Sequence, residues 1–132
     1  MRSAALALAF WLAGAAAVAA QTPFLSKGRT FDEADGAALY AHVCSACHRA
    51  DGEGMTGAGS YPALKGDPRL ASTDYLIVVL LDGQRAMPAL GRAMNDAQLA
   101  DLINFVRRTF AGVNDDPATP DRAAAARAAL KR

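Results

Sequence analysis

The stretch Cys44-Ser45-Ala46-Cys47-His48 decides how this chain is interpreted. Two thiols separated by two residues, with an imidazole directly after the second, form the C-x-x-C-H signature for covalent attachment of a c-type haem. The thiols can add to the two vinyl groups of one porphyrin edge, and the imidazole that follows can then reach the iron. We therefore predict one haem c, attached through Cys44 and Cys47, with His48 as an axial iron ligand.

Other uses of the two cysteines fit the sequence less well. A redox-active C-x-x-C is expected near a βαβ pattern, which this sequence lacks. A structural zinc site needs four ligands, and His42, Cys44, Cys47 and His48 are too closely spaced on one helix to form a tetrahedral cage. A simple disulfide leaves the adjacent His48 without a role. Haem attachment is therefore the preferred interpretation.

Met87 is the favoured second axial ligand. It lies in the segment 84–91, which has no helical period and separates two predicted helices. Pro88 fixes the backbone directly after it, and a thioether on a stiff segment suits an axial ligand. The alternative is that Met87 only fills a gap beside the haem.

Three further side chains are weaker ligand candidates. Met94 immediately precedes the start of a predicted helix, and Met55 follows His48 after only seven residues. His42 lies on the same helix as Cys44 and cannot reach the opposite face of the ring. An open distal position is the remaining alternative.

The apolar pattern predicts three main helices, over residues 32–46, 72–82 and 95–110. The last helix has the clearest signals, because Asn95 and Gln98 can form a capping box and Gly112 can end it. The apolar run within 72–82 fits a buried helix or a strand, and we prefer a helix because no other segment offers a partner strand. The mature core would be thin, and a haem would fill it.

The remaining segments are predicted to be irregular. Residues 49–68 contain five glycines and two prolines, which indicate a long loop, and loops of this length are usually functional. Residues 113–132 form a linker and an Ala/Arg-rich tail, which could be a short helix but has no strong apolar face. We expect this tail to fray.

The first twenty residues have the pattern of an export signal. Arg2 and Ser3 are followed by the seventeen uncharged residues 4–20, and Val18-Ala19-Ala20 provides small residues before a cut at Gln21. An uncleaved anchor is the alternative, because seventeen residues is close to the shortest span. Cleavage would leave an irregular arm over 21–30 and thirteen basic against thirteen acidic residues. That balance argues against binding to nucleic acid or anionic lipid, and we expect a periplasmic protein.

The segment from Phe31 to Phe110 resembles class I c-type cytochromes, especially small bacterial ones similar to the cytochrome subunits of periplasmic dehydrogenases. The resemblance rests on ordered stretches: 44–48, Asp51-Gly-Glu-Gly54, Tyr61-Pro-Ala-Leu-Lys-Gly66, Met87-Pro-Ala-Leu90 and Leu99-Ala-Asp-Leu-Ile-Asn-Phe-Val-Arg107. It implies a cytochrome c domain over 31–112, an all-α fold whose three main helices surround the haem.

The resemblance also implies roles for particular residues. Gly36 and Tyr40 on the first helix would cross Leu102 and Phe105 on the last. The carbonyl of Pro62 would accept a hydrogen bond from the second ring nitrogen of His48, and Met87 would be the distal ligand.

These features predict a carrier of single electrons rather than an enzyme. Iron held by His and Met has no open position for a substrate, and the thioether stabilises the ferrous state. The expected partners are redox proteins, a dehydrogenase donor and an oxidase or cytochrome acceptor, and the isolated protein is expected to be a monomer. The alternatives are a subunit bound tightly to a dehydrogenase or oxidase, and a haem sensor or peroxidase-like enzyme with an open distal site.

Overall fold

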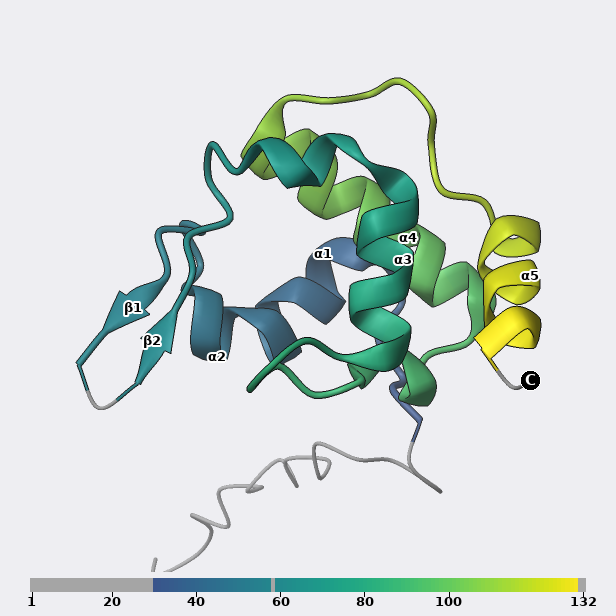
Figure 1. Cartoon of the computed structure of the whole chain (residues 1–132), viewed down its shortest axis with the longest axis horizontal. Helices are drawn as coiled ribbons and strands as arrows, with labels where there is room; N and C mark the ends of the chain where they lie inside the picture. The colour runs from purple at the N-terminus through teal and green to yellow at the C-terminus, as the bar shows by residue number, and fades with distance from the viewer. Residues whose placement is uncertain (1–29, 58, 131–132) are drawn as a thin grey trace, which may run out of the picture.

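The computed structural model describes residues 30–57 and 59–130, so the predicted export signal (1–20) and nearly all of the predicted arm (21–30) lie outside the described residues. The described chain is mostly helical and has one two-stranded sheet. Figure 1 shows the central helices flanked on one side by the hairpin of β1 (Met55–Thr56) and β2 (Ser60–Tyr61) and on the other by α5 (Pro120–Leu130). The helical fold was predicted correctly, and the small sheet was not predicted.

The first helical segment is continuous but begins later than expected. It comprises α1 (Gly36–Leu39), η1 (Tyr40–Cys44), which is wound as a π-helix, and α2 (Ser45–His48). The predicted start at Asp32 was wrong, because Asp35 has an extended backbone and caps the helix by accepting a hydrogen bond from the Ala38 amide. The predicted end at Ala46 was also early, since the helix extends to His48.

The first helix crosses α4 (Asp96–Val106) at very close range. A side-chain carbon at Gly36 would overlap the backbone of Asp101 and Leu102, so only glycine permits this approach. One turn further, the Tyr40 ring packs against Phe105 with centroids 5.5 Å apart. The predicted crossing of the first and last helices is confirmed.

The other two predicted helices are also present. The segment with the ambiguous apolar run forms α3 (Thr73–Asp82), with the Ser72 side chain as its N-cap. The capping box of Asn95 and Gln98 is formed at the start of α4. The helix continues through η4 (Arg107–Ala111), another π-helical segment, and ends at Gly112 in a left-handed conformation.

The long glycine-rich segment is less irregular than predicted. Strands β1 and β2 pair antiparallel, with Met55 opposite Tyr61 and Thr56 opposite Ser60. A short 3-10 turn, η2 (Pro68–Ala71), follows the hairpin and leads into α3. A second such turn, η3 (Leu90–Ala93), lies between α3 and α4. The hairpin has only two residues in each strand, which is too short to give an alternating apolar pattern.

Arg107 is buried where η2, η4 and the C-terminal linker meet. Its side chain is 2% exposed, and its guanidinium donates to the carbonyls of Leu70 and Ala71 on one side and of Asp115 and Asp116 on the other. A buried charge is tolerated when its donors are satisfied. Arg107 therefore joins α4 to two segments that are distant in sequence.

The C-terminal tail forms helix α5, and the expected fraying is not found through Leu130. Ala123 is completely buried against the domain. The linker before α5 is fixed by Asn104, whose side chain both donates to and accepts from the backbone of Ala118 at 2.9 Å. Because these contacts are polar and Ala is small, the apolar pattern did not reveal them.

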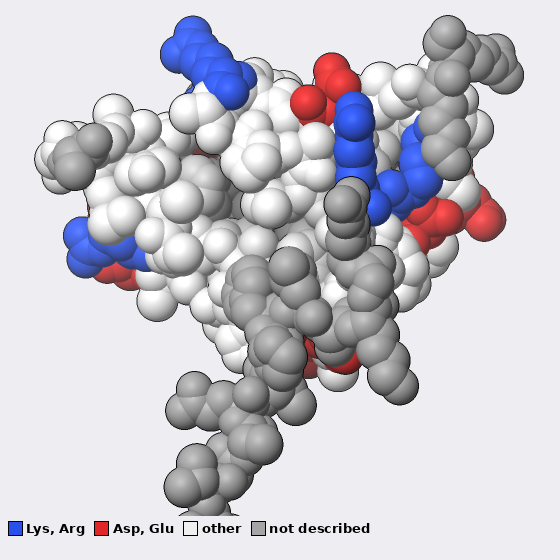
Figure 2. Space-filling model, turned by 90° about the horizontal axis from the view of Figure 1, so that it is seen from below, with Lys and Arg blue, Asp and Glu red and all other residues white. Residues whose placement is uncertain are grey.

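Charged side chains are dispersed and mostly paired. On the face shown in Figure 2, most basic groups lie next to acidic ones, one basic group stands apart, and wide areas of other residues separate them. Among the ion pairs of the described residues, Arg127 lies 3.0 Å from Asp96. Within residues 30–57 and 59–130, no helix is both long and apolar enough to cross a bilayer.

The close approach of the first helix to α4 at Gly36 can be tested by substitution. Gly36→Ala should lower the free energy of unfolding by about 1–3 kcal/mol, because overpacking exceeds the gain of up to about 1 kcal/mol in helix propensity. Denaturant unfolding measures this change. As a control, Ala37→Gly alters an exposed neighbour and should cost no more than about 1 kcal/mol. A Gly36→Ala protein at least as stable as the unsubstituted one would contradict the close crossing.

Candidate haem site

The C-x-x-C-H motif lies at the C-terminal end of the first helical segment. Cys44 is the last residue of η1 and is buried, whereas Cys47 on α2 is half-buried. Both thiols are free. Burial, together with the nearby Cys47, raises the pKa of Cys44 to about 12, so its thiol is protonated at neutral pH. One turn of helix thus presents two thiols and an imidazole.

His48 is oriented by the loop that follows it. Its Nδ1 lies 2.9 Å from the carbonyl oxygen of Pro62. Because a carbonyl only accepts, Nδ1 carries a hydrogen and donates it, so in the neutral ring Nε2 is the nitrogen with a free lone pair that can bind a metal. This is the hydrogen bond that the cytochrome resemblance implied, and it fixes both the tautomer and the plane of the ring.

Tyr40 supports the same region from the helix side. Its hydroxyl donates to the carbonyl of Arg49, the residue after His48, at 2.7 Å. Its ring contacts Phe110 at a centroid distance of 4.9 Å. Burial is the largest cause that raises the pKa of Tyr40 to about 12, so the hydroxyl stays neutral and keeps its donor hydrogen. The hydrogen bonds to the carbonyls of Arg49 and Pro62 thereby hold both ends of residues 49–62, the segment that follows the motif.

A cavity with mostly apolar walls opens in front of Cys44 and His48. The residues that line it come from the first helix, the loop, η2, α3, the segment after α3 and α4: Tyr40, Cys44, His48, Pro62, Leu64, Asp67, Arg69, Leu70, Tyr75, Leu76, Val79, Leu80, Gln84, Met87, Leu102, Ile103 and Val106. An apolar cleft with a few polar groups is typical of a cofactor site.

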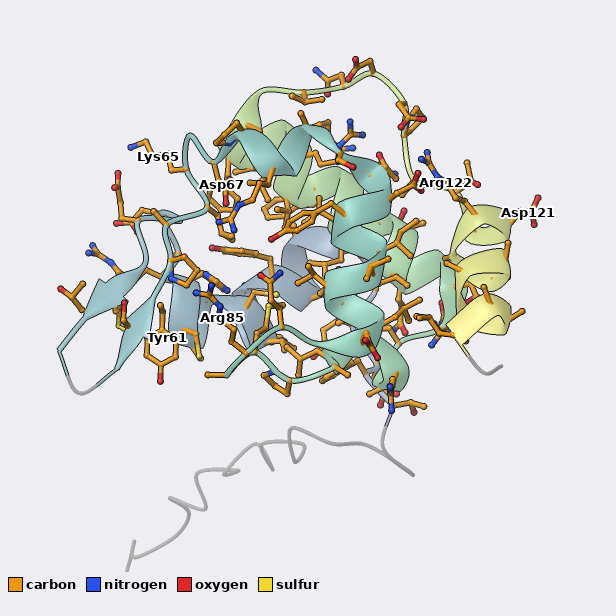
Figure 3. All side chains as sticks on the ribbon, viewed as in Figure 1. Tyr61, Lys65, Asp67, Arg85, Asp121 and Arg122 are labelled. Atoms are coloured by element: carbon orange, nitrogen blue, oxygen red, sulfur yellow. The ribbon has the colours of Figure 1, made fainter. Side chains whose placement is uncertain are left out.

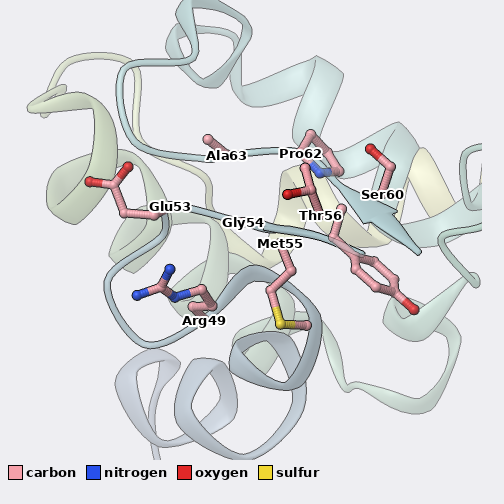
Figure 4. Close-up of a pocket in the computed structure, with 9 residues that line it drawn as sticks. Arg49, Glu53, Gly54, Met55, Thr56, Ser60, Pro62 and Ala63 are labelled. Carbon is pink, nitrogen blue, oxygen red and sulfur yellow. The ribbon is translucent and has the colours of Figure 1, made fainter. Parts of the chain in front are cut away.

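Of the candidate distal ligands, only Met87 lines this cavity within the described residues. Met94 is 4% exposed and belongs to the hydrophobic core. Met55 lies in a separate open hollow beside the hairpin, on the same side as Arg49 (Figure 4). His42 is 62% exposed and faces Glu33, with 3.1 Å between Nδ1 and Oε1. The structure therefore brings Met87 to the same cavity as Cys44 and His48 and leaves the other three outside it.

A polar cluster at the cavity was not foreseen from the sequence. Arg69 pairs with Asp67 at 2.7 Å and lies over the Tyr75 ring, 5.7 Å from its centroid. The hydroxyl of Tyr75 donates to the Gln84 side chain at 3.1 Å. Hydrogen bonds from Arg69 hold the pKa of Asp67 below its usual value. Asp67 and Arg69 are two residues apart, but Tyr75 and Gln84 follow Arg69 only after six and fifteen residues, so no local motif reveals the whole cluster.

The residues present fit a covalently held haem. Two free thiols and an imidazole with an available Nε2 adjoin an apolar cavity, and a thioether lines the same cavity. No group of three or more His, Cys, Asp or Glu side chains within the described residues could hold a bare metal ion. One imidazole, one thioether and two thiols beside an apolar cavity are side chains that would suit a porphyrin iron.

Comparison with known families agrees with this chemistry. The family described as cytochrome c oxidase, cbb3-type, subunit III, matches residues 31–106, and the chain belongs to this family. The matched range begins at Phe31, ends with the last residue of α4, and contains the motif, Pro62 and Met87. The cofactor of c-type cytochromes is haem c. Helix α5 lies beyond the matched range.

The individual relatives are cytochrome subunits of dehydrogenases. The chain is 33% identical over 91 residues to the gluconate 2-dehydrogenase cytochrome c subunit of Pantoea cypripedii, covering 60% of this chain and 21% of the relative. It is 34% identical to the fructose dehydrogenase cytochrome subunit of Gluconobacter japonicus, covering 58% and 18%. The chain thus spans about a fifth of the length of these curated relatives.

A solved structure also matches. The c-type cytochrome XoxG from Methylobacterium extorquens AM1 is 26% identical, with a TM-score of 0.47, and the match covers 71% of this chain and 64% of that chain.

Proposed function

We propose that this protein is a periplasmic carrier of single electrons. In this proposal one haem c is attached through Cys44 and Cys47, with His48 as the proximal and Met87 as the distal iron ligand. The observation that carries the proposal is the cavity that Cys44, His48 and Met87 line together. Export is supported by the signal-like sequence of residues 1–20.

The side chains around the cavity favour electron transfer over substrate chemistry. When bound, haem supplies a reversible one-electron couple, and a thioether ligand and burial both raise its potential. Pro62 keeps the ring of His48 in one orientation, and the apolar walls of the cavity would exclude water from a bound haem. As the distal ligand, Met87 would occupy the position that a substrate or gas molecule needs. A haem sensor or peroxidase-like enzyme, which requires that position to be open, is therefore the weaker candidate.

A second candidate function comes from the relatives. Their names describe cytochrome subunits of dehydrogenases, so this chain could be a permanent subunit of such a complex instead of a free carrier. Both functions use the same haem site and differ in how long the protein stays bound to its partner.

Intact mass spectrometry of the purified protein tests attachment and export together. The expected mass is that of the chain from Gln21 onward plus one haem, because two thioether bonds survive denaturation. Cys44→Ala combined with Cys47→Ala should give the chain mass alone. Haem that leaves the unsubstituted protein under denaturing conditions would refute attachment, and a chain that retains Met1 would refute cleavage.

The distal ligand is tested by Met87→Leu, which removes the sulfur with little change in volume. The oxidised protein should lose its thioether-to-iron charge-transfer band, and the reduction potential should fall because the ligand that favours ferrous iron is gone. Absorption spectra and a redox titration measure both effects.

Met94→Leu is the matched control for Met87→Leu. Because Met94 packs in the core, its replacement should cost less than about 1.5 kcal/mol of stability and leave the band and the potential unchanged. If the two phenotypes were exchanged, Met94 would be the ligand. If neither variant changed the band, the sensor or enzyme function would take precedence.

The partner question is decided by gel filtration of a detergent-free extract from the source organism. A free carrier makes small, transient interfaces and should elute as a haem-stained monomer at moderate salt. Co-elution with a dehydrogenase activity that persists through repeated runs would favour the permanent subunit.

A further inference from the structure

One arginine of the C-terminal helix reaches the segment that carries Met87. We call residues 83–95, which connect α3 to α4, the strap. The guanidinium of Arg127 donates to the carbonyls of Gly91 and Met94 at 3.1 and 3.0 Å, and its Nε lies 3.0 Å from Oδ1 of Asp96. Its side chain is 22% exposed. All three acceptors lie within six consecutive residues, at the end of the strap and the first turn of α4.

Other contacts also hold the strap, and they show which part of it depends on Arg127. A tight turn joins Gln84 and Met87 through two backbone hydrogen bonds, of 3.0 and 2.9 Å. Nearer the far end, Gly91 lies directly against the backbone of Leu80 on α3, and Arg92 donates to the Leu81 carbonyl. Arg127 binds η3 from the outer side. The C-terminal half of the strap is therefore held between α3 and α5.

The composition of α5 makes Arg127 central to this arrangement. Among its described residues, Ala123 alone is buried, and Leu130 is exposed. Because alanine contributes little apolar area, polar contacts must provide much of the docking energy. A guanidinium offers five donors in a rigid plane, so one side chain can satisfy a carboxylate and two carbonyls at once.

We propose that Arg127 is a positioning residue for the distal ligand, and that α5 serves to keep the strap closed over the haem. This inference rests on the proposed ligation by Met87. Met87 lies four residues before Gly91, the first strap residue that Arg127 holds, so in this proposal a displacement of the strap that carries Met87 away from the iron also breaks the hydrogen bonds of Arg127. The C-terminal helix thereby lowers the population of the state in which the distal position is open.

Binding of imidazole to the oxidised protein measures that population. Imidazole can bind only where Met87 has left the iron, so its apparent affinity is proportional to the open fraction. Arg127→Gln shortens the side chain and removes its charge, and the apparent imidazole affinity should rise roughly tenfold, as expected for the loss of charge-assisted hydrogen bonds. Amide hydrogen exchange over residues 90–94 should accelerate in the same variant.

Arg122→Gln is the matched control. Arg122 is also on α5 and is 30% exposed, but it pairs with Asp74 in the first turn of α3 and with Asp116 in the linker. Its loss should remove the ion pairs of α5 with α3 and the linker but leave the hydrogen bonds of Arg127 to the strap intact, so the imidazole affinity should not change. If both variants raised the affinity equally, general packing of α5 would be responsible, and the specific role of Arg127 would be refuted.

The remaining outcomes separate the inference from the function on which it rests. If Arg127→Gln left the imidazole affinity unchanged while Met87→Leu raised it, the ligand assignment would stand and the positioning role would be wrong. If the unsubstituted protein bound imidazole as tightly as Met87→Leu does, Met87 would not be the ligand. Should Arg127→Gln fail to fold, Arg127→Lys replaces it, because one ammonium cannot match the guanidinium fork; an unchanged affinity would again refute the role.

Discussion

Two parts of this structure, the wall of the cavity and the linker that leads to α5, depend on the hydrogen bonds of the buried Arg107 guanidinium. Toward the cavity it holds the carbonyls of Leu70 and Ala71, and toward the C-terminus those of Asp115 and Asp116. A charge removed from water costs several kcal/mol unless its donors are matched, and here backbone carbonyls provide most of the match. Loss of the side chain would leave several inward-facing carbonyls without a donor, each costing about 1–3 kcal/mol. The wall of the cavity and the path of the linker to α5 are therefore fixed by the same group.

Around the candidate haem site, backbone groups contribute as much as side chains to holding His48 and Met87 in place. The ring of His48 is oriented by the Pro62 carbonyl, and the segment after it is tied to Tyr40 through the Arg49 carbonyl. The strap that carries Met87 is held by backbone hydrogen bonds within its own turn and by its carbonyls at the η3 end, which accept from the Arg127 guanidinium. If His48 and Met87 hold the iron as proposed, ligands fixed in this way would keep their positions when the charge on the iron changes, which suits the proposed transfer of electrons.

The sequence was sufficient to predict the features that follow from local patterns. The C-x-x-C-H motif, the capping box at Asn95 and the apolar spacing of α4 each lie within a few residues, so their chemistry can be deduced without a fold. The start of the first helix was predicted four residues too early. Acidic residues are favoured near a helix N-terminus, and the sequence does not show which of several acids is the N-cap; in the structure it is Asp35. The hairpin was missed because two residues per strand give no period. The docking of α5 was missed because Asn104, Arg122 and Arg127 bind partners 14 to 48 residues away, and polar contacts of this range leave no pattern in the sequence.

The opposite placement of α5 and the β1–β2 hairpin has a consequence for how the molecule can be handled and attached. Figure 3 shows Tyr61 on the hairpin and Arg122 on α5 at the two ends of the long axis, with the helices between them. A surface, label or fusion partner linked beyond Leu130 would stand on the α5 side and leave the hairpin end uncovered. A tether attached after α5 would therefore immobilise the molecule in one orientation, with the hairpin end facing the solution.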